Sequence, residues 1–479
     1  AAQVPGSSYA LVAKAYDAAE NMTTSPTVTI TIAGGGGGTG PTRHRGMIPQ
    51  DETWWPSGNP HIIESDVYTG NNVTLTIKPG CIVQFAAGTE LYTGYSNPGS
   101  IIAIGTPDSM ITFTALSDTV PGFWEDVGFY SNTISTARMS YCQVLFGGKG
   151  SGDNGAVLVE ACNIRLDHTI IRKSGGYGVY VDDNGYFSDF SNNTITGCTK
   201  YPVRIDANFA RTIGTDNVLT GNAKDGIEVD GGAISTSGTW LNHGVPYVVK
   251  SNTYVQDDAT LAISAGVTVS MNPGVEFYCG YSSPGSIIAV GTAGSPITFT
   301  ALTDTVPGIW KGLSFYGQTI STARLSYCIV ERAGSSSIEG AVYVYDCRIK
   351  MDNCTVRKNA KYGVFCDGGG CFDDFSNNTI TASGEYPIGI EADKVRTLGS
   401  GNVLTGNTKN GILVDGGNIK TTGTWLNHNV PYVVDGNTYV SDETGNPVLT
   451  IAPGTTLRMT PRTEFYVGYG APGGLIADG

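Results

Sequence analysis

The sequence predicts an all-β solenoid in which short strands stack coil upon coil. The composition supports strands, because the 66 glycines, 25 tyrosines and abundant Thr, Asn and Ser suit strands and tight turns better than helices. A repeat of about 24 residues supports the solenoid, since it is too short for a propeller blade and lacks the 3.6-residue apolar period of an α-solenoid. It fits three short strands per coil, each paired in parallel with the next coil.

The short repeat is clearest in the second half of the chain. Asn378-Thr379-Ile380-Thr381 is followed 24 residues later by Asn402-Val403-Leu404-Thr405. At the same spacing, residues 386–391 are followed by residues 410–415, which carry a similar apolar pattern. One coil is therefore expected to contain about 24 residues.

A longer repeat of about 185 residues divides the chain into units. Trp54 opens a segment that restarts at Trp240 and again at Trp425, and residues 101–116 closely match residues 287–302. The third copy reaches about a third of a unit. We expect repeat units at 53–238 and 239–423 and a truncated unit at 424–479.

Residues 1–33 have a different pattern. Two alternating segments at 9–17 and 27–32 resemble the C-terminal strands of a bacterial immunoglobulin-like domain, and a short helix over 10–20 is the alternative. The glycine-rich segment 34–52 is predicted to be a flexible linker.

The coil pattern and the unit pattern together carry a family resemblance. Gly-[Ile/Val]-x-Val-Asp recurs at 178–182 and 411–415, and the first two units end their opening third with Pro/Met-Ile-Thr-Phe-Thr-Ala-Leu. These motifs resemble the right-handed parallel β-helix proteins of the pectate-lyase-like superfamily, in particular large repeat proteins of bacterial exteriors. The resemblance covers 53–479 and implies a right-handed parallel β-helix. It implies no single activity, because that superfamily includes lyases, hydrolases, adhesins and inert scaffolds.

Charge and cysteine usage exclude several classes of function. The formal net charge of −14 would repel nucleic acid and an anionic membrane surface, so we expect neither as a partner. The sequence contains no run of 18 apolar residues, so it predicts no membrane-spanning helix. The ten cysteines lack zinc-site spacing. Cys371 could form a disulfide with Cys347 or Cys366, but stacked buried thiols are the favoured interpretation.

Acidic residues recur at one position of successive coils. Their carboxylates should form an outward ladder with rungs about 4.8 Å apart, where like charges repel unless a cation compensates. Calcium suits such oxygen ligands in a secreted protein, although Asp-Gly turns would explain the same residues. The predicted calcium ladder comprises Asp182, Asp206 and Asp230 in the first unit and Asp367, Glu391 and Asp415 in the second.

Aromatic residues recur as well, at the start of each unit and in Gly-Tyr-x-x-Pro-Gly turns. Exposed rings at these positions could stack on sugars, whereas the alternative role is to cap the core or brace a turn. The predicted carbohydrate-binding residues are Trp54, Trp240, Trp425, Tyr95, Tyr281 and Tyr469.

Catalytic residues are not identifiable from the sequence. Arg204 lies in the ladder, where a lyase of this fold would need a base, but Gly389 takes its place in the second unit. We therefore expect a structural or adhesive extracellular protein, a stiff rod within a longer surface protein or fibre. A polysaccharide lyase or hydrolase and a carbohydrate-binding module are the alternatives. Expected partners are other copies, neighbouring domains of the same polypeptide and polysaccharide; no cofactor is required, with calcium as the candidate.

Overall fold

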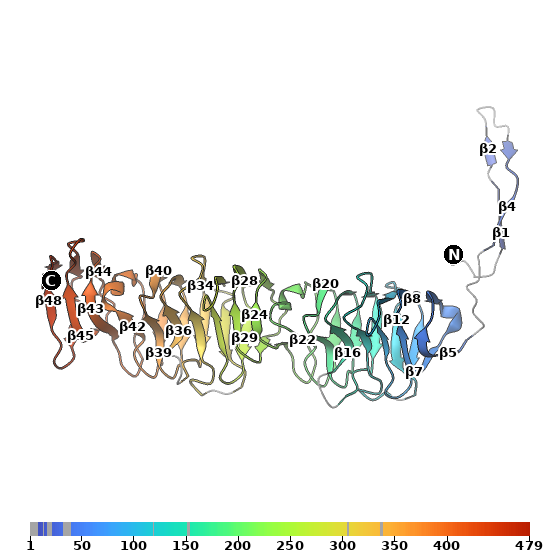
Figure 1. The fold of residues 1–479 in the computed structure, drawn as a ribbon, viewed down its shortest axis with the longest axis horizontal. Coiled ribbons are helices and arrows are strands. Elements are labelled where there is room, and N and C mark those ends of the chain that lie inside the picture. Colours follow the sequence, from blue (N-terminus) through green and yellow to red (C-terminus); the bar gives the residue numbers. More distant parts are fainter. Residues whose placement is uncertain are drawn as a thin grey trace.

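In the computed structural model of the chain, parallel coils stack into one long rod (Figure 1). The structure describes residues 8–12, 14–16, 22–31, 40–117, 119–150, 154–303, 306–335 and 339–479. The rod has about 18 turns of about 24 residues with almost no helix, which confirms the predicted fold. The stack continues through the predicted unit boundary at Thr239, because β23 (Ile227–Val229) pairs in parallel with β26 (Tyr247–Val249).

Each full coil contributes one strand to each of three sides of the rod, which we call sides 1, 2 and 3 in chain order. Side 1 contains β7 (His61–Thr69), β10 (Leu91–Thr93), β13 (Val127–Phe129), β16 (Gly155–Glu160), β19 (Tyr177–Asp182), β22 (Val203–Ile205), β23, β26, β29 (Thr268–Met271), β32 (Ile297–Ala301), β35 (Cys328–Glu331), β38 (Thr355–Arg357) and β41 (Thr379–Thr381).

Sides 2 and 3 are built in the same way. Side 2 contains β6 (Glu52–Trp54), β8 (Val73–Ile77), β11 (Gly99–Ile104), β14 (Arg138–Ser140), β17 (Asn163–Asp167), β20 (Tyr186–Ser191), then β25 (Gly238–Trp240), β28 (Ala259–Ile263), β31 (Gly285–Val290), β34 (Arg324–Ser326), β37 (Arg348–Asp352) and β40 (Cys371–Ser376). Side 3 contains β5 (Thr42–Ile48), β9 (Ile82–Phe85), β12 (Ile111–Ala115), β15 (Cys142–Leu145), β18 (Ile170–Arg172) and β21 (Thr194–Thr196). In the second unit the third sheet of each coil is separate from side 3. It contains β24 (Gly232–Ile234), β27 (Thr253–Val255), β30 (Glu276–Cys279), β33 (Gly312–Phe315), β36 (Gly340–Tyr345), β39 (Tyr362–Asp367), β42 (Ile388–Glu391), β43 (Ile412–Ile419), β45 (Tyr432–Val440), β47 (Leu457–Met459) and, paired with β45, β48 (Phe465–Val467).

The remaining elements are short. They are the strands β44 (Gly423–Trp425), β46 (Val448–Ile451) and β49 (Gly474–Ile476) and the short 3-10 helices η1 (Pro56–Gly58), η2 (Ala210–Thr212) and η3 (Ala392–Thr397). η2 contacts both β20 and β25, and η3 contacts both β40 and β44, so side 2 continues from unit to unit and includes β44, β46 and β49. β10 of the first unit lies on side 1, whereas its counterpart β30 lies in the separate sheet of the second unit.

The predicted linker over 34–52 is too long at its C-terminal end. β5 pairs in parallel with β7, and its side chains alternate between more and less exposed, so the first coil begins before residue 53. Residues 34–39 lie outside the described residues.

The N-terminal segment forms two antiparallel strand pairs in its described part. β1 (Ser8–Leu11) pairs with β4 (Val28–Thr31), and β2 (Lys14–Tyr16) pairs with β3 (Met22–Thr24). The predicted strands are therefore confirmed in these residues, and the alternative helix is wrong for them. The immunoglobulin-like assignment stays a prediction.

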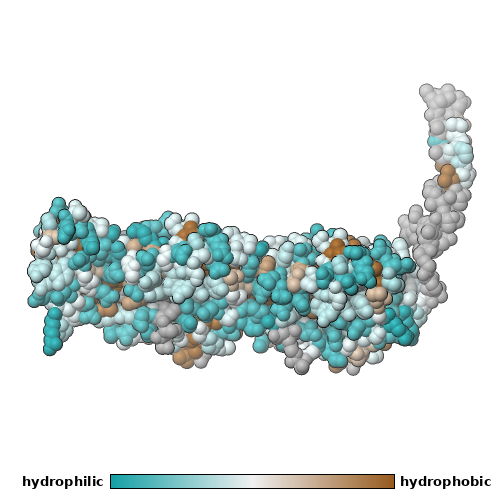
Figure 2. Space-filling view, viewed as in Figure 1, coloured by the Kyte–Doolittle hydropathy of each residue, from teal (hydrophilic) through white to brown (hydrophobic). Residues whose placement is uncertain are grey.

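The interior of the rod is apolar, whereas most of its visible surface is hydrophilic or neutral (Figure 2). Ladders of buried asparagines lie at the turns. Asn193 accepts a hydrogen bond from the Thr169 amide at 3.0 Å and donates one to the Leu166 carbonyl at 2.9 Å. Asn378 repeats this arrangement in the second unit. These bonds satisfy backbone groups that would otherwise be buried without partners, which explains why Asn recurs at the coil period. All ten cysteines are free and buried, as the thiol interpretation expected.

Candidate functional site

The acidic ladder of the first unit forms as predicted. Asp182, Asp206 and Asp230 are partly buried, and each offers a carboxylate oxygen within 4.8 Å of the others. Asp206 also accepts a hydrogen bond from the backbone amide of Asn184 at 3.0 Å. Burial raises the pKa of Asp206, and the charges of Asp230 and Asp182 raise it further. The ladder carboxylates therefore accept hydrogen bonds in turns, as the alternative role predicted, and they also repel one another, which a bound cation would relieve.

Protein cations already compensate part of this first ladder. Arg204 Nε lies 2.7 Å from Asp230 Oδ2, and Lys250 Nζ lies 3.3 Å from Asp230 Oδ1. In the second unit these two positions are Gly389 and Asp435.

The second ladder is longer and more acidic than the first, because Asp435 extends it and Gly389 replaces an arginine. Glu391 lies beside Asp415, and Asp415 lies beside Asp435 in neighbouring strand segments. The pKa of Asp415 is raised by burial and by the charges of Asp435, Asp367 and Glu391. Gly369 donates its amide to Glu391 at 3.0 Å, so the turn role recurs here too.

Calcium binding to the ladders stays a prediction. We expect millimolar calcium to raise the melting temperature by a few degrees and a chelator to reverse the change, because a ligand that binds only the folded state stabilises it. Differential scanning calorimetry measures this effect. The variant Asp182→Asn/Asp206→Asn/Asp367→Asn/Asp415→Asn, which neutralises both ladders, should lose most of it. An unchanged melting temperature in wild type would leave the ladders with the turn role alone.

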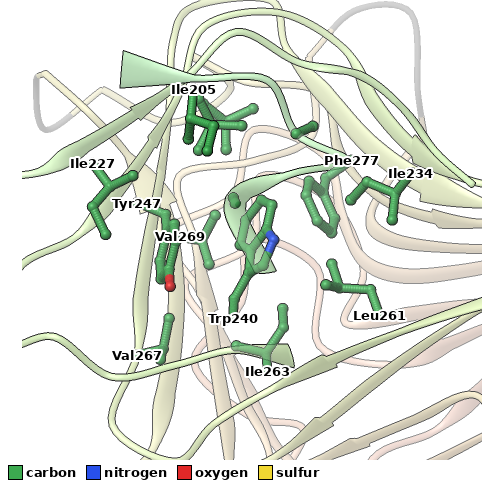
Figure 3. Close-up of a cluster of buried hydrophobic side chains, with 14 of the residues drawn as sticks. Ile205, Ile227, Ile234, Trp240, Tyr247, Leu261, Ile263, Val267, Val269 and Phe277 are labelled. Atoms are coloured by element: carbon green, nitrogen blue, oxygen red, sulfur yellow. The ribbon is translucent and has the colours of Figure 1, made fainter. Parts of the chain in front are cut away.

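The three unit-opening tryptophans are not carbohydrate-binding residues. Trp54, Trp240 and Trp425 are 1%, 0% and 1% exposed, so their faces cannot reach a sugar. Figure 3 shows Trp240 inside the rod, between Tyr247 and Phe277. Its ring stacks on that of Tyr247 at 4.7 Å and meets Phe277 edge-on at 5.8 Å. The core-capping alternative is the one that the structure supports.

The three turn tyrosines are exposed and belong to a repeated cluster. Tyr95, Tyr281 and Tyr469 are 64%, 65% and 66% exposed. Tyr95 stands edge-on to Tyr92 at 6.1 Å and to Tyr130 at 5.1 Å. We call each such group of rings a tyrosine platform.

The second platform is built like the first. Tyr281 contacts Tyr278 at 6.1 Å and Tyr316 at 4.9 Å, and both contacts are edge-on. In the third platform Tyr469 contacts Tyr466 at 5.0 Å and Tyr439 at 6.0 Å, and both rings are tilted relative to it. Tyr439 lies opposite Tyr466 on the preceding strand, so it is a different supporting ring from Tyr130 and Tyr316. Supporting rings hold each exposed tyrosine in place, which lowers the entropy lost when it stacks on a ligand.

A cleft of about 470 Å³ lies beside the first platform, and its acidic residues were not predicted from the sequence. Glu90, Glu125 and Asp126 line it together with Tyr92, Tyr95 and Tyr130. Burial and the charges of Asp66 and Glu125 together raise the pKa of Glu90 to about 7. One signal in the sequence could have identified Glu90. A Glu lies two residues before the supporting tyrosines Tyr92, Tyr278 and Tyr466, as Glu90, Glu276 and Glu464.

The second unit keeps the platform but changes the acids of the cleft. Lys311 takes the place of Glu125 and Gly312 that of Asp126. Lys311 Nζ lies 3.8 Å from Glu276, whose other oxygen accepts a hydrogen bond from the Tyr316 hydroxyl at 2.7 Å.

Comparison with known proteins agrees with this architecture. A family model described as a right handed beta helix region matches residues 95–239, and one described as a pectate-lyase like beta helix domain matches residues 232–355. No curated protein and no solved structure matched the chain. Taken with the parallel stack of coils, the two family matches make this chain a right-handed parallel β-helix repeat protein with a pectate-lyase-like fold. In the described residues, no helix has the length and apolarity needed to span a membrane.

Proposed function

We propose that the chain is an extracellular structural and adhesive rod that binds polysaccharide through its tyrosine platforms. The observation that carries this proposal is the repetition of one exposed tyrosine, supported by two other rings, in all three units. An exposed, rigid aromatic face suits the apolar face of a sugar ring. The framework of the rod recurs between units while the acids around the platforms change. Such conservation of framework and platform favours binding over one shared catalytic centre.

Replacing the three platform tyrosines by alanine, in Tyr95→Ala/Tyr281→Ala/Tyr469→Ala, is expected to weaken polysaccharide binding at least tenfold. Each lost ring removes stacking worth about 1 kcal/mol, and several weak contacts act together on one polymer. Affinity electrophoresis against neutral, acidic and amino polysaccharides measures the change. The matched variant Tyr95→Phe/Tyr281→Phe/Tyr469→Phe keeps the rings and should retain binding. Full binding by the alanine variant, with an unchanged melting temperature, would contradict the proposal.

A polysaccharide hydrolase or lyase is the second candidate, favoured by one observation in the first unit. The pKa of about 7 at Glu90 suits a general acid near neutral pH, and it lies in a cleft beside a sugar-sized aromatic platform. New reducing or unsaturated ends after prolonged incubation of the wild-type chain with the same polysaccharides would support an enzyme. Glu90→Gln should abolish their release.

A further inference from the structure

The cleft of the first unit differs chemically from its counterpart in the second unit. Glu90 and Asp126 precede paired strand residues on β10 and β13, with Leu91 opposite Val127, so the two carboxylates lie on adjacent coils about 4.8 Å apart along the rod. Glu125 also lines the cleft. Burial and the charge of Asp66 raise the pKa of Glu125, and the charge of Lys149 partly offsets this rise.

Asp126 is the informative member of this group. The residue is 2% exposed, and its Oδ1 has no hydrogen-bond partner among the described residues, yet it lines the cleft. The carboxylate lies over Gly128, because a methyl group at Gly128 would stand 2.9 Å from Asp126 Oδ1 and 3.0 Å from the Tyr130 ring. A buried carboxylate oxygen without a donor is costly, so it marks a position that a ligand donor would fill.

A chelated metal ion fits the cleft poorly. In the part of the chain that the structure describes, Asp182, Asp206 and Asp230 are the one group of potential metal ligands whose atoms converge within 4.8 Å. The carboxylates of the cleft are instead distributed around it, next to three tyrosine rings. Aromatic faces combined with carboxylates suit an organic cation, which the rings attract through their π electrons while the carboxylates accept its N–H groups.

We propose that the cleft beside Tyr95 binds a saccharide that carries an ammonium group, so that the first unit selects amino sugars within a polysaccharide. This inference rests on the proposed function, since the Tyr95 platform supplies the stacking surface. Glu125 and Asp126 accept the ammonium N–H groups. Burial raises the pKa values of Glu90, Glu125 and Asp126, and the bound ammonium charge stabilises the ionised forms of these carboxyls. The second platform lacks this selectivity, because Lys311 and Gly312 occupy the two decisive positions and Lys311 would repel an ammonium group.

The test compares two ligands of one length, a β-linked glucosamine hexamer and its fully N-acetylated form, by titration calorimetry at about 150 mM salt. Salt at this concentration screens the general attraction of a cationic oligosaccharide to an acidic chain. Wild type should bind the glucosamine hexamer at least tenfold more tightly, as expected for a charged hydrogen bond in a partly buried site. The variant Glu125→Lys/Asp126→Gly, which copies the second unit, should lose this preference and keep its affinity for the N-acetylated hexamer.

The control variant Asp183→Asn/Asp216→Asn/Asp346→Asn raises the net charge by the same amount at exposed turn positions with positive φ, which Asn tolerates. It should retain the preference. Equal binding of the two hexamers by wild type, or a preference that survives in Glu125→Lys/Asp126→Gly, would overturn the inference and leave the proposed function intact. If wild type bound neither hexamer nor any other polysaccharide, both the inference and the proposed function would be overturned.

Discussion

Replacing Trp240 by alanine is expected to lower the free energy of unfolding by about 3–5 kcal/mol, the usual cost of truncating a large buried ring. The side chain is fully buried and packs between Tyr247 and Phe277, so its loss leaves a cavity lined by aromatic rings. Because each coil of a solenoid contacts only its neighbours, the loss of stability should be largest in the coils around residue 240.

Hydrogen exchange followed by mass spectrometry measures this local effect, together with chemical denaturation for the whole chain. Trp55→Ala is the matched control, because Trp55 is 41% exposed and should change stability little. Equal effects of the two substitutions would contradict the core role of the unit-opening tryptophans.

Replacing Asp352 by alanine is expected to cost about 3 kcal/mol, since the loss of one partner leaves the others without their hydrogen bonds. Asp352 is buried and accepts hydrogen bonds from Ser326 at 2.7 Å, from Arg324 at 2.7 Å and from Asn353 at 2.8 Å. Asp167 occupies the same place in the first unit, where it pairs with Arg138 and Arg165. Urea denaturation of the variant measures the loss, and Asp346→Asn at an exposed turn serves as the control.

The pH dependence of stability tests the same cluster. Burial raises the pKa of Asp352, but the hydrogen bonds from Ser326, Asn353 and Arg324 outweigh it, so the pKa lies below its usual value. The stabilisation is therefore complete above the unfolded pKa of about 3.9 and is lost as the pH falls through the lower folded value. Wild type should lose stability below about pH 4, and Asp352→Ala should lose less over the same range. Parallel pH profiles of the two chains would contradict this role.

The coil architecture was predictable because it depends on local patterns that repeat. The spacing between Asn378 and Asn402 reports a buried hydrogen-bond ladder, and Asn recurs wherever that ladder must be continued. The linker boundary was wrong because β5 has few strongly apolar residues and becomes a strand only by pairing with β7. Pairing with a neighbour can override weak local propensity.

The candidate sites were predicted less completely, for two physical reasons. Recurrence identifies Trp240 and Tyr95 equally well, but it does not tell a core ring from an exposed one, which depends on the direction of the side chain. The sequence did not identify Asp126 as a candidate because this residue does not recur: its counterpart is Gly312. Its significance appears only when β10 and β13 bring it beside Glu90.

The continuity of side 2 has a consequence for how such a rod would hold a polymer. Tyr95, Tyr281 and Tyr469 lie a few residues before β11, β31 and β49, which belong to side 2 in successive units. The platforms therefore recur along one edge of the rod, so a straight glycan strand parallel to the rod axis can meet all three. Many such rods in a polysaccharide matrix would each hold single strands at regular intervals and stiffen them along their length, instead of joining strands that run in different directions.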